Sequence, residues 1–226
     1  LWNNNESLGA LCADNLFSSD HIEEESCHLI ALLARMVAHG ITLRRSEAEL
    51  RRLALHDTLT GLLNRRAGID SLQQQISSSC RNRYPVSLCF LDLDGLKRVN
   101  DEQGHAVGDH FLKSVTALIQ DAKRDADIAV RMGGDEMMLI FPGTHLVEAE
   151  QMIARLMEMA DVSESLNTIA PGPWFSYGLA EFDPAQADCA GLDSAAEADR
   201  LINEADMRMY LQKREHGIAR REGSRG

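Results

Sequence analysis

The feature that most constrains this chain is the apolar run Val86–Leu91 (Val-Ser-Leu-Cys-Phe-Leu), which ends directly in Asp92-Leu93-Asp94. A run of this length without polar alternation is typical of a buried strand in the middle of a sheet. The acidic segment then lies where that strand leaves the core. The sequence therefore predicts a central strand with carboxylates at its C-terminal end.

A compact α/β domain is predicted from about Leu55 onward, because helical and strand patterns alternate along it. The order after the first helix is strand, helix, strand, strand, helix, strand, which is the ferredoxin-like split pattern. The predicted fold class is α+β: a ferredoxin-like, palm-type antiparallel central sheet flanked by helices, preceded by a long N-terminal signalling helix. The predicted strands are 86–91, 128–131, 137–141 and 175–180, and the predicted helices are 65–78, 107–119, 147–160 and 195–214.

The segment Met132-Gly133-Gly134-Asp135-Glu136 joins the second and third of these strands as a glycine-containing hairpin. In this topology the first and third strands are antiparallel neighbours, so Asp92 is expected beside Asp135 and Glu136. Acids also end strands for no functional reason, and for an isolated Asp-x-Asp that explanation suffices. Two converging acidic segments instead favour a site for Mg²⁺, which prefers oxygen ligands and usually brings phosphates.

The net charge of −12 bears on the class of ligand. Nucleic-acid polymers are bound through basic surfaces, so we expect no polymer partner. A small nucleotide is still compatible with this charge, because a bound divalent cation reverses the local sign set by carboxylates.

The five cysteines, Cys12, Cys27, Cys80, Cys89 and Cys189, are widely scattered. None forms a Cys-x-x-Cys pair, so the sequence predicts neither a zinc site nor a disulfide framework. Reduced thiols in a cytoplasmic protein are the expectation.

The N-terminal region has a pattern of its own. A strand is predicted over Leu8–Cys12, and a helix from Asp20, where Glu23 completes a capping box. Its charged second half is either an amphipathic connector that pairs with its copy in another subunit or a lone solvated helix, and both interpretations stay open. The longest apolar stretch, Leu29–Val37, is interrupted by Arg35 and too short to cross a bilayer, so no membrane segment is expected.

Several blocks of the chain lie in a characteristic order and spacing: 57–66 (DTLTGLLNRR), 92–101 (DLDGLKRVND), 104–105, 108–109, 133–137 (GGDEM), 205–206 and 210–213. Together they resemble GGDEF domains. The segment Gly133–Met137 stands where the name-giving motif belongs, with methionine in place of its phenylalanine, and the resemblance covers about Leu53 to Lys213.

The resemblance implies a diguanylate cyclase, which condenses two GTP molecules into cyclic di-GMP and releases pyrophosphate. It implies that Asp92, the Leu93 carbonyl and Asp135 hold Mg²⁺, with Mn²⁺ as an alternative. Glu136 would support the metal site and help to deprotonate the attacking 3′-hydroxyl, and Lys97 is the third residue assigned to catalysis beside Asp135.

The same resemblance implies how the substrate is held. Backbone amides at Gly95 and Leu96, together with Lys97, would cradle the phosphates, and Lys213 would reach them from the last helix. The two residues that would read guanine are Asn100 and Asp109. The family's arginine after the final lysine is missing here, and which basic residue replaces it stays open.

Cyclic di-GMP is two-fold symmetric, so the resemblance implies a homodimer with one GTP in each half-site. Two alternatives remain: a catalytically silent domain that acts as a receptor for GTP or cyclic di-GMP, and another metal-dependent nucleotidyl cyclase or polymerase of the same fold. Intact acids and Lys97 disfavour the first, and the missing basic groove disfavours a polymerase.

Arg124-Asp125-Ala126-Asp127 fits the R-x-x-D motif of product-inhibited family members, with Arg155 as a second contributor. The alternative is a local ion pair at a helix end. The predicted domains are 1–54, a remnant of a sensory domain plus connector helix, and 55–226, the catalytic domain. The sensory part is predicted because Leu8–Asp14 and the following helix resemble the end of a GAF domain.

Overall fold

The computed structural model describes residues 2–3, 6–10, 24–170, 172 and 174–223. The chain divides into two compact units, Leu1–Ala54 and Leu55–Gly226. The predicted domains, a sensory remnant with a connector helix and a catalytic domain, stay a prediction. Asp20 and Glu23, the predicted cap, lie outside the described residues.

The first unit contains the antiparallel pair β1 (Trp2–Asn3) and β2 (Glu6–Ser7) and the helix α1 (Glu24–Leu55). The predicted strand Leu8–Cys12 is wrong over Leu8–Ala10, which form no strand, and its remainder is not described. A Leu-Gly-Ala sequence contains a glycine and no β-branched residue, so it has little strand propensity.

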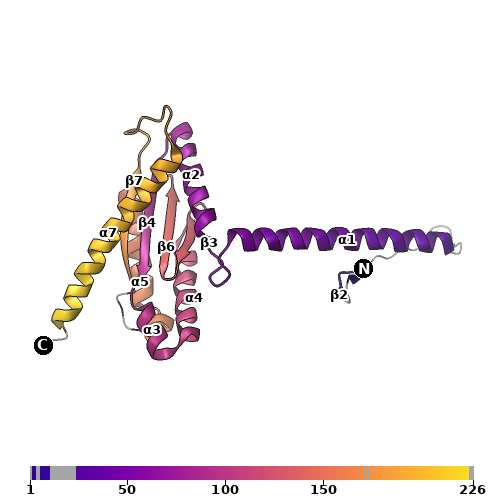
Figure 1. Cartoon of the computed structure of the whole chain (residues 1–226), viewed down its shortest axis with the longest axis horizontal. Coiled ribbons are helices and arrows are strands. Elements are labelled where there is room, and N and C mark those ends of the chain that lie inside the picture. The colour runs from indigo at the N-terminus through magenta and orange to yellow at the C-terminus, as the bar shows by residue number, and fades with distance from the viewer. Residues whose placement is uncertain (1, 4–5, 11–23, 171, 173, 224–226) are drawn as a thin grey trace. The chain divides into compact units, whose positions relative to one another are not determined.

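Helix α1 is one uninterrupted helix in Figure 1. Most of its large apolar side chains are exposed within the single chain. Within it, Ser26–Leu55 is long and apolar enough to cross a membrane by length and composition. The expectation that the chain has no membrane segment therefore stays a prediction.

The second unit is built on a five-stranded sheet with the order β3-β5-β6-β4-β7. All four predicted strands are confirmed, and their pairs are antiparallel. The sheet is nevertheless mixed, because the short unpredicted strand β3 pairs parallel with β5. The strands are β3 (Leu63–Asn64), β4 (Val86–Leu93), β5 (Ile128–Gly133), β6 (Glu136–Pro142) and β7 (Phe175–Phe182).

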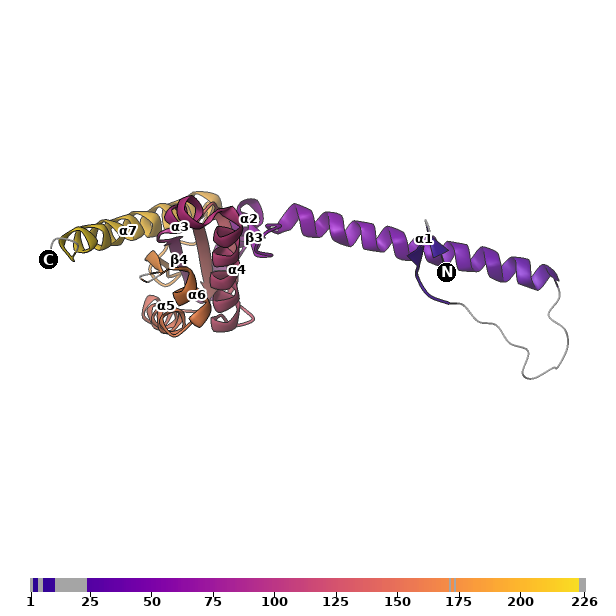
Figure 2. The ribbon, with the colours of Figure 1, turned by 90° about the horizontal axis from the view of Figure 1, so that it is seen from below.

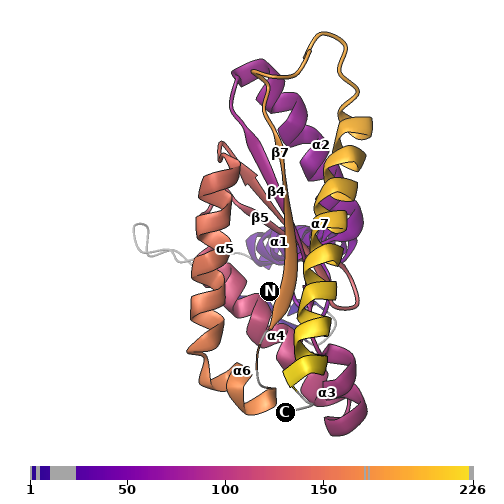
Figure 3. The same cartoon turned by 90° about the vertical axis from the view of Figure 1, so that its left-hand side faces the viewer.

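Helices cover both faces of this sheet, which explains why β4 is buried along its whole length. Helices α2 and α7 pack on one face, and α3, α4, α5 and α6 contribute to the core on the other (Figures 2 and 3). The helices are α2 (Arg65–Asn82), α3 (Leu96–Gln103), α4 (His105–Ala122), α5 (Leu146–Asp161), α6 (Glu164–Ile169) and α7 (Ser194–Gly223). The sequence predicted neither α3 nor α6.

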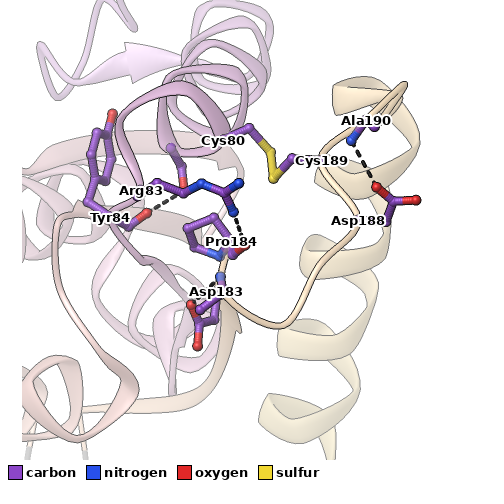
Figure 4. Close-up of a disulfide and its surroundings, with 10 residues drawn as sticks. Cys80, Arg83, Tyr84, Asp183, Pro184, Asp188, Cys189 and Ala190 are labelled. Atoms are coloured by element: carbon purple, nitrogen blue, oxygen red, sulfur yellow. Dashed lines mark hydrogen bonds between the residues drawn. A yellow bond between two sulfur atoms is a disulfide. The ribbon is translucent and has the colours of Figure 1, made fainter.

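Cys80 and Cys189 form a disulfide, so the prediction of reduced, unpaired cysteines is wrong for these two (Figure 4). They are 109 residues apart in sequence, whereas their Cα atoms lie 5.5 Å apart. A pairing set by packing of distant elements leaves no local motif. Cys27 is a free exposed thiol, and burial raises the pKa of the free thiol of Cys89 far above its usual range.

Candidate active site

The two acidic segments meet at one edge of the sheet. Asp92, near the end of β4, pairs with Glu136 at the start of β6, and the Leu93 amide donates a 3.0 Å hydrogen bond to the Asp135 carbonyl. This is the neighbourhood that the predicted topology requires. Asp92 is 6% exposed, so its carboxylate is nearly buried beside the turn.

The electrostatics of this cluster favour added positive charge. Burial raises the pKa of Asp92, the carboxylates of Asp135 and Asp94 raise it further, and Lys213 opposes the shift. Burial also raises the pKa of Glu136, and the charges of Asp92 and Asp135 add to this effect. Carboxylates this close repel one another when ionised, so a cation among them would relieve the repulsion.

Lys213 provides one such cation in the structure. Its Nζ lies 2.6 Å from Asp92 Oδ1, in an ion pair that connects α7 with the end of β4. Burial opposes the charged form of Lys213, but the hydrogen bond with Asp92 and the charges of Asp92, Asp94 and Asp135 together outweigh burial and raise the pKa of the lysine. The position beside Asp92 therefore suits a positive charge.

Within the described residues, no group of three or more His, Cys, Asp and Glu side chains is arranged to hold a metal ion alone. Any ion bound here would need further oxygen ligands from backbone carbonyls, water or a ligand. Mg²⁺ commonly binds in this way, through one or two carboxylates plus phosphates and water. The chemistry of the donor set thus fits magnesium.

Arg131 holds the turn that carries Asp135. Its Nε and Nη2 donate to the Gly134 carbonyl at 3.2 and 2.9 Å, and its Nη1 donates to Asp57 Oδ1 at 3.0 Å. The same Asp57 oxygen accepts from the amide and hydroxyl of Thr60 at 2.9 and 2.6 Å. Burial raises the pKa of Asp57, but these hydrogen bonds outweigh burial and lower it. Sequence reasoning assigned no role to Arg131, Asp57 or Thr60.

The predicted phosphate-binding segment follows β4 directly. Gly95 has φ +89°, a left-handed conformation that favours glycine, and it is the N-cap of α3. The first amides of a helix have no intrahelical acceptor, so those after Gly95 are available to an anion. Lys97, in the first turn, is exposed, whereas Leu96 is buried.

The two predicted guanine-reading residues lie on helices that pack together, α3 and α4. A Cβ atom on Gly108 would lie only 1.9 Å from Asn100 Oδ1, so the side chain of Asn100 rests against the backbone next to Asp109. Asp109 itself is exposed. The structure therefore brings Asn100 close to the segment that carries Asp109.

The R-x-x-D segment forms a closed turn between α4 and β5. The Arg124 amide donates to Asp127 Oδ2 at 2.8 Å, and the Asp127 amide donates to the Arg124 carbonyl at 3.0 Å. Asp127 is buried, whereas Arg124 and, on α5, Arg155 are exposed. The acid therefore shapes the turn, and the guanidinium of Arg124 faces solvent.

Two cavities help to delimit the site. A cavity of about 220 Å³ opens beside Glu136, between the α2–α7 layer and the sheet; it is lined by Arg65, Phe90, Met132, Glu136, Ile202, Asn203 and Asp206. A larger one, about 680 Å³, lies along α2 and includes none of the converging acids. We place the candidate site at the acids, because size alone does not identify chemistry.

The split βαββαβ arrangement, with acids meeting between its first and third strands, places this unit in the palm-type class of α+β domains. The family model "Diguanylate cyclase, GGDEF domain" matches residues 54–218, and the chain belongs to this family. The predicted family is confirmed, whereas the GAF resemblance stays a prediction.

Three curated relatives show how far the similarity extends. Diguanylate cyclase DgcP of Pseudomonas aeruginosa is 30% identical over 87% of this chain, and the bifunctional diguanylate cyclase/cyclic di-GMP phosphodiesterase MucR of the same species is 38% identical over 80%. Diguanylate cyclase DgcS of Shewanella oneidensis is 33% identical over 73%. The chain spans 28%, 25% and 51% of these relatives' own lengths.

Solved structures give the same result for the fold. The coiled coil and GGDEF domain of DgcB from Caulobacter crescentus, in complex with c-di-GMP, has a TM-score of 0.68 and 26% identity, covering 83% of this chain and 95% of that one. Diguanylate cyclase SiaD from Pseudomonas aeruginosa, in complex with its activator SiaC, has a TM-score of 0.62 and 25% identity, covering 84% and 70%.

Proposed function

We propose that this chain is a diguanylate cyclase that condenses two GTP molecules into cyclic di-GMP and releases pyrophosphate. The observation that carries the proposal is the meeting of Asp92 with the Asp135–Glu136 turn beside a phosphate-accessible helix start. Relatives named as diguanylate cyclases support it. GTP is a cytoplasmic metabolite, so we place this unit in the cytoplasm.

Asp92, the Leu93 carbonyl and Asp135 would hold Mg²⁺, or Mn²⁺ in its place. A divalent cation here would neutralise triphosphate charge and stabilise the pyrophosphate leaving group. Glu136 is the residue we assign to accept the proton of the 3′-hydroxyl, because its raised pKa favours proton uptake.

The phosphates would bind at the start of α3, where the amides at Gly95 and Leu96 and the Lys97 ammonium converge on an anion. In the structure the Lys213 ammonium pairs with Asp92. When the nucleotide binds, this ammonium would instead pair with a phosphate oxygen, because a flexible lysine side chain can reach either partner. Asn100 and Asp109 would bind the edge of the guanine base. The Asn100 amide can donate and accept hydrogen bonds, and the Asp109 carboxylate can accept them.

A symmetric product made from two substrates needs two domains, so we propose a homodimer with one GTP per half-site. Helix α1 supports this proposal. Leu29, Met36, Leu43 and Leu50 recur every seven residues and are 58%, 64%, 52% and 67% exposed in the single chain. A seven-residue apolar repeat is the pattern by which two helices form a coiled coil.

Replacing Leu43 by glutamate is expected to weaken dimerisation at least about tenfold, because it puts two like charges in the apolar seam. Sedimentation velocity over a concentration series measures this shift. Ala48→Glu adds the same charge to an exposed position off the repeat and should leave the dimer intact. Equal dissociation constants for the two variants would contradict the α1 interface.

We further propose that product inhibits the enzyme through Arg124, with Arg155 contributing and Asp127 shaping the turn. Arg124→Ala should raise the cyclic di-GMP concentration for half-inhibition at least about tenfold, because a guanidinium fork on guanine or phosphate is lost. Initial rates at increasing added product give this value, and Lys113→Ala, on exposed α4 surface, is the control. Unchanged inhibition in Arg124→Ala would remove the hypothesis.

The proposed activity is tested by incubating the purified chain with GTP and Mg²⁺ and identifying products by mass spectrometry. Cyclic di-GMP and pyrophosphate should form, and neither should form with Asp135→Ala. Binding of GTP or cyclic di-GMP without turnover would instead identify a silent receptor domain and overturn the proposal.

A further inference from the structure

The connector between β7 and α7, residues 183–193, is attached to the end of α2 by the Cys80–Cys189 disulfide (Figure 4). Cys80 lies in the last turns of α2, and Cys189 lies in the middle of the connector. Both residues are partly exposed and lie at the edge of the core that α2 and α7 share. The disulfide is therefore at the surface side of this core and not in its centre.

Few other polar contacts hold the connector to α2. In the described part of the chain one hydrogen bond joins the connector to the residue that directly follows α2, from Arg83 Nη1 to the Pro184 carbonyl at 3.0 Å. The connector's other hydrogen bonds are local: Ala185 and Gln186 donate to Asp183, Ala190 donates to Asp188, and Asp193 accepts from the first turn of α7. The disulfide is thus the main covalent or polar restraint on the connector's position.

The surroundings of the two sulfur atoms differ. Cys80 is held in a regular helix, with Arg81 and Arg83 following it, whereas Cys189 lies between the exposed residues Asp188 and Ala190 in a segment without helix or strand. Thiol–disulfide exchange needs access to the sulfur in line with the bond that breaks. The open connector gives that access at Cys189.

We propose that Cys80 and Cys189 form a reversible thiol–disulfide site that exchanges with low-molecular-weight disulfides of the glutathione type. The Cys189 thiolate attacks one sulfur of the disulfide RSSR, so a mixed disulfide Cys189–S–S–R forms and one thiolate RS⁻ leaves. The Cys80 thiolate then attacks Cys189 Sγ, which releases the second RS⁻. Two protein thiols are oxidised, one RSSR is reduced to two RSH, and two electrons pass between them.

The state of this site would control the connector and leave the acids at the sheet edge in place. Helix α7 packs on the sheet through the buried residues Ala198, Leu201 and Ala205, which do not depend on the disulfide. Reduction therefore frees residues 183–193 locally while Lys213 stays on the same packed helix. In reducing compartments persistent structural disulfides are rare, and those that form are usually redox-responsive.

The test treats the reduced chain (residues 1–226) with oxidised glutathione, quenches it with an alkylating reagent and maps the cysteines by peptide mass spectrometry. The wild type should give a linked Cys80–Cys189 peptide. Cys80→Ser should trap glutathione on Cys189, whereas Cys189→Ser should carry at least about tenfold less on Cys80. Mapping separates these products from modification of the exposed Cys27.

Limited proteolysis gives the structural readout. Cleavage within residues 183–193 should be at least about fivefold slower in the oxidised than in the reduced wild type, because a restrained segment opens less often. In the Cys80→Ser/Cys189→Ser variant cleavage should not respond to oxidation. Alkylation of both cysteines despite excess oxidised glutathione, or equal cleavage of the two wild-type forms, would overturn the proposal.

Discussion

Asp135→Asn is expected to lower the rate of cyclic di-GMP formation at least about a thousandfold, because metal-dependent phosphoryl chemistry loses a charged ligand where charge develops. The substitution is isosteric, so the Gly133–Glu136 turn and the Leu93–Asp135 backbone hydrogen bond should persist. Initial rates with GTP and Mg²⁺, read by product chromatography, give the ratio. Asp125→Asn, an acid in the exposed turn after α4, is the control and should keep full activity.

The thermal midpoint of Asp135→Asn shows whether this variant is still folded. The charge of Asp135 helps to raise the pKa of both Asp92 and Glu136. A carboxyl whose folded pKa is raised contributes stability below its unfolded pKa, and this stability is lost as pH rises through the folded pKa. At neutral pH, removing the repelling charge should therefore leave the thermal midpoint equal or higher. An inactive variant with a clearly lower midpoint would show that the loss came from unfolding, and an active one would contradict the metal assignment.

Arg131→Ala is expected to reduce kcat about a hundredfold with a much smaller change in KM, because displacement of reacting groups by about 1 Å can cost that much. Arg131 binds the Gly134 carbonyl through two nitrogens and ties it to Asp57. Without this fork the turn can move, and Asp135 and Glu136 move with it. Steady-state kinetics at saturating and limiting GTP separate the two constants.

Two further variants sharpen this prediction. Arg131→Lys keeps the charge but loses the planar fork, so it should recover only part of kcat. Arg83→Ala removes a comparable bond, to the Pro184 carbonyl at the other end of the domain, and should leave kcat unchanged. Equal losses in Arg131→Ala and Arg83→Ala would mean that the effect is general destabilisation and not positioning of the turn.

The pairing of β4 with β6 was predictable because it follows from patterns that are local in the sequence. An unalternating apolar run requires a buried strand, and the βαββαβ order requires it to lie beside the strand after the hairpin. The pairing of Asp92 with Glu136 follows from these two statements. Met137, which replaces the family's phenylalanine, is fully buried, as expected of a core position.

What the sequence did not predict depends on packing between distant segments. Helix α3 is short and is preceded by Gly95 as its N-cap, whose left-handed conformation cannot be predicted from the surrounding polar residues. The two-residue strand β3 exists only because it pairs with β5. The Lys213–Asp92 ion pair and the Cys80–Cys189 bond join residues 121 and 109 positions apart, beyond the reach of any periodicity.

The most direct measurement of the central claim is Mn²⁺ binding, followed by electron paramagnetic resonance, in the presence of 3′-deoxy-GTP, which lacks the attacking hydroxyl. The wild type should remove free Mn²⁺ from solution beyond what the nucleotide alone removes, because the acids of β4 and the hairpin would complete the ion's ligand set. The double variant Asp92→Asn/Asp135→Asn should show only the binding due to nucleotide. Equal Mn²⁺ binding by wild type and double variant would contradict the site.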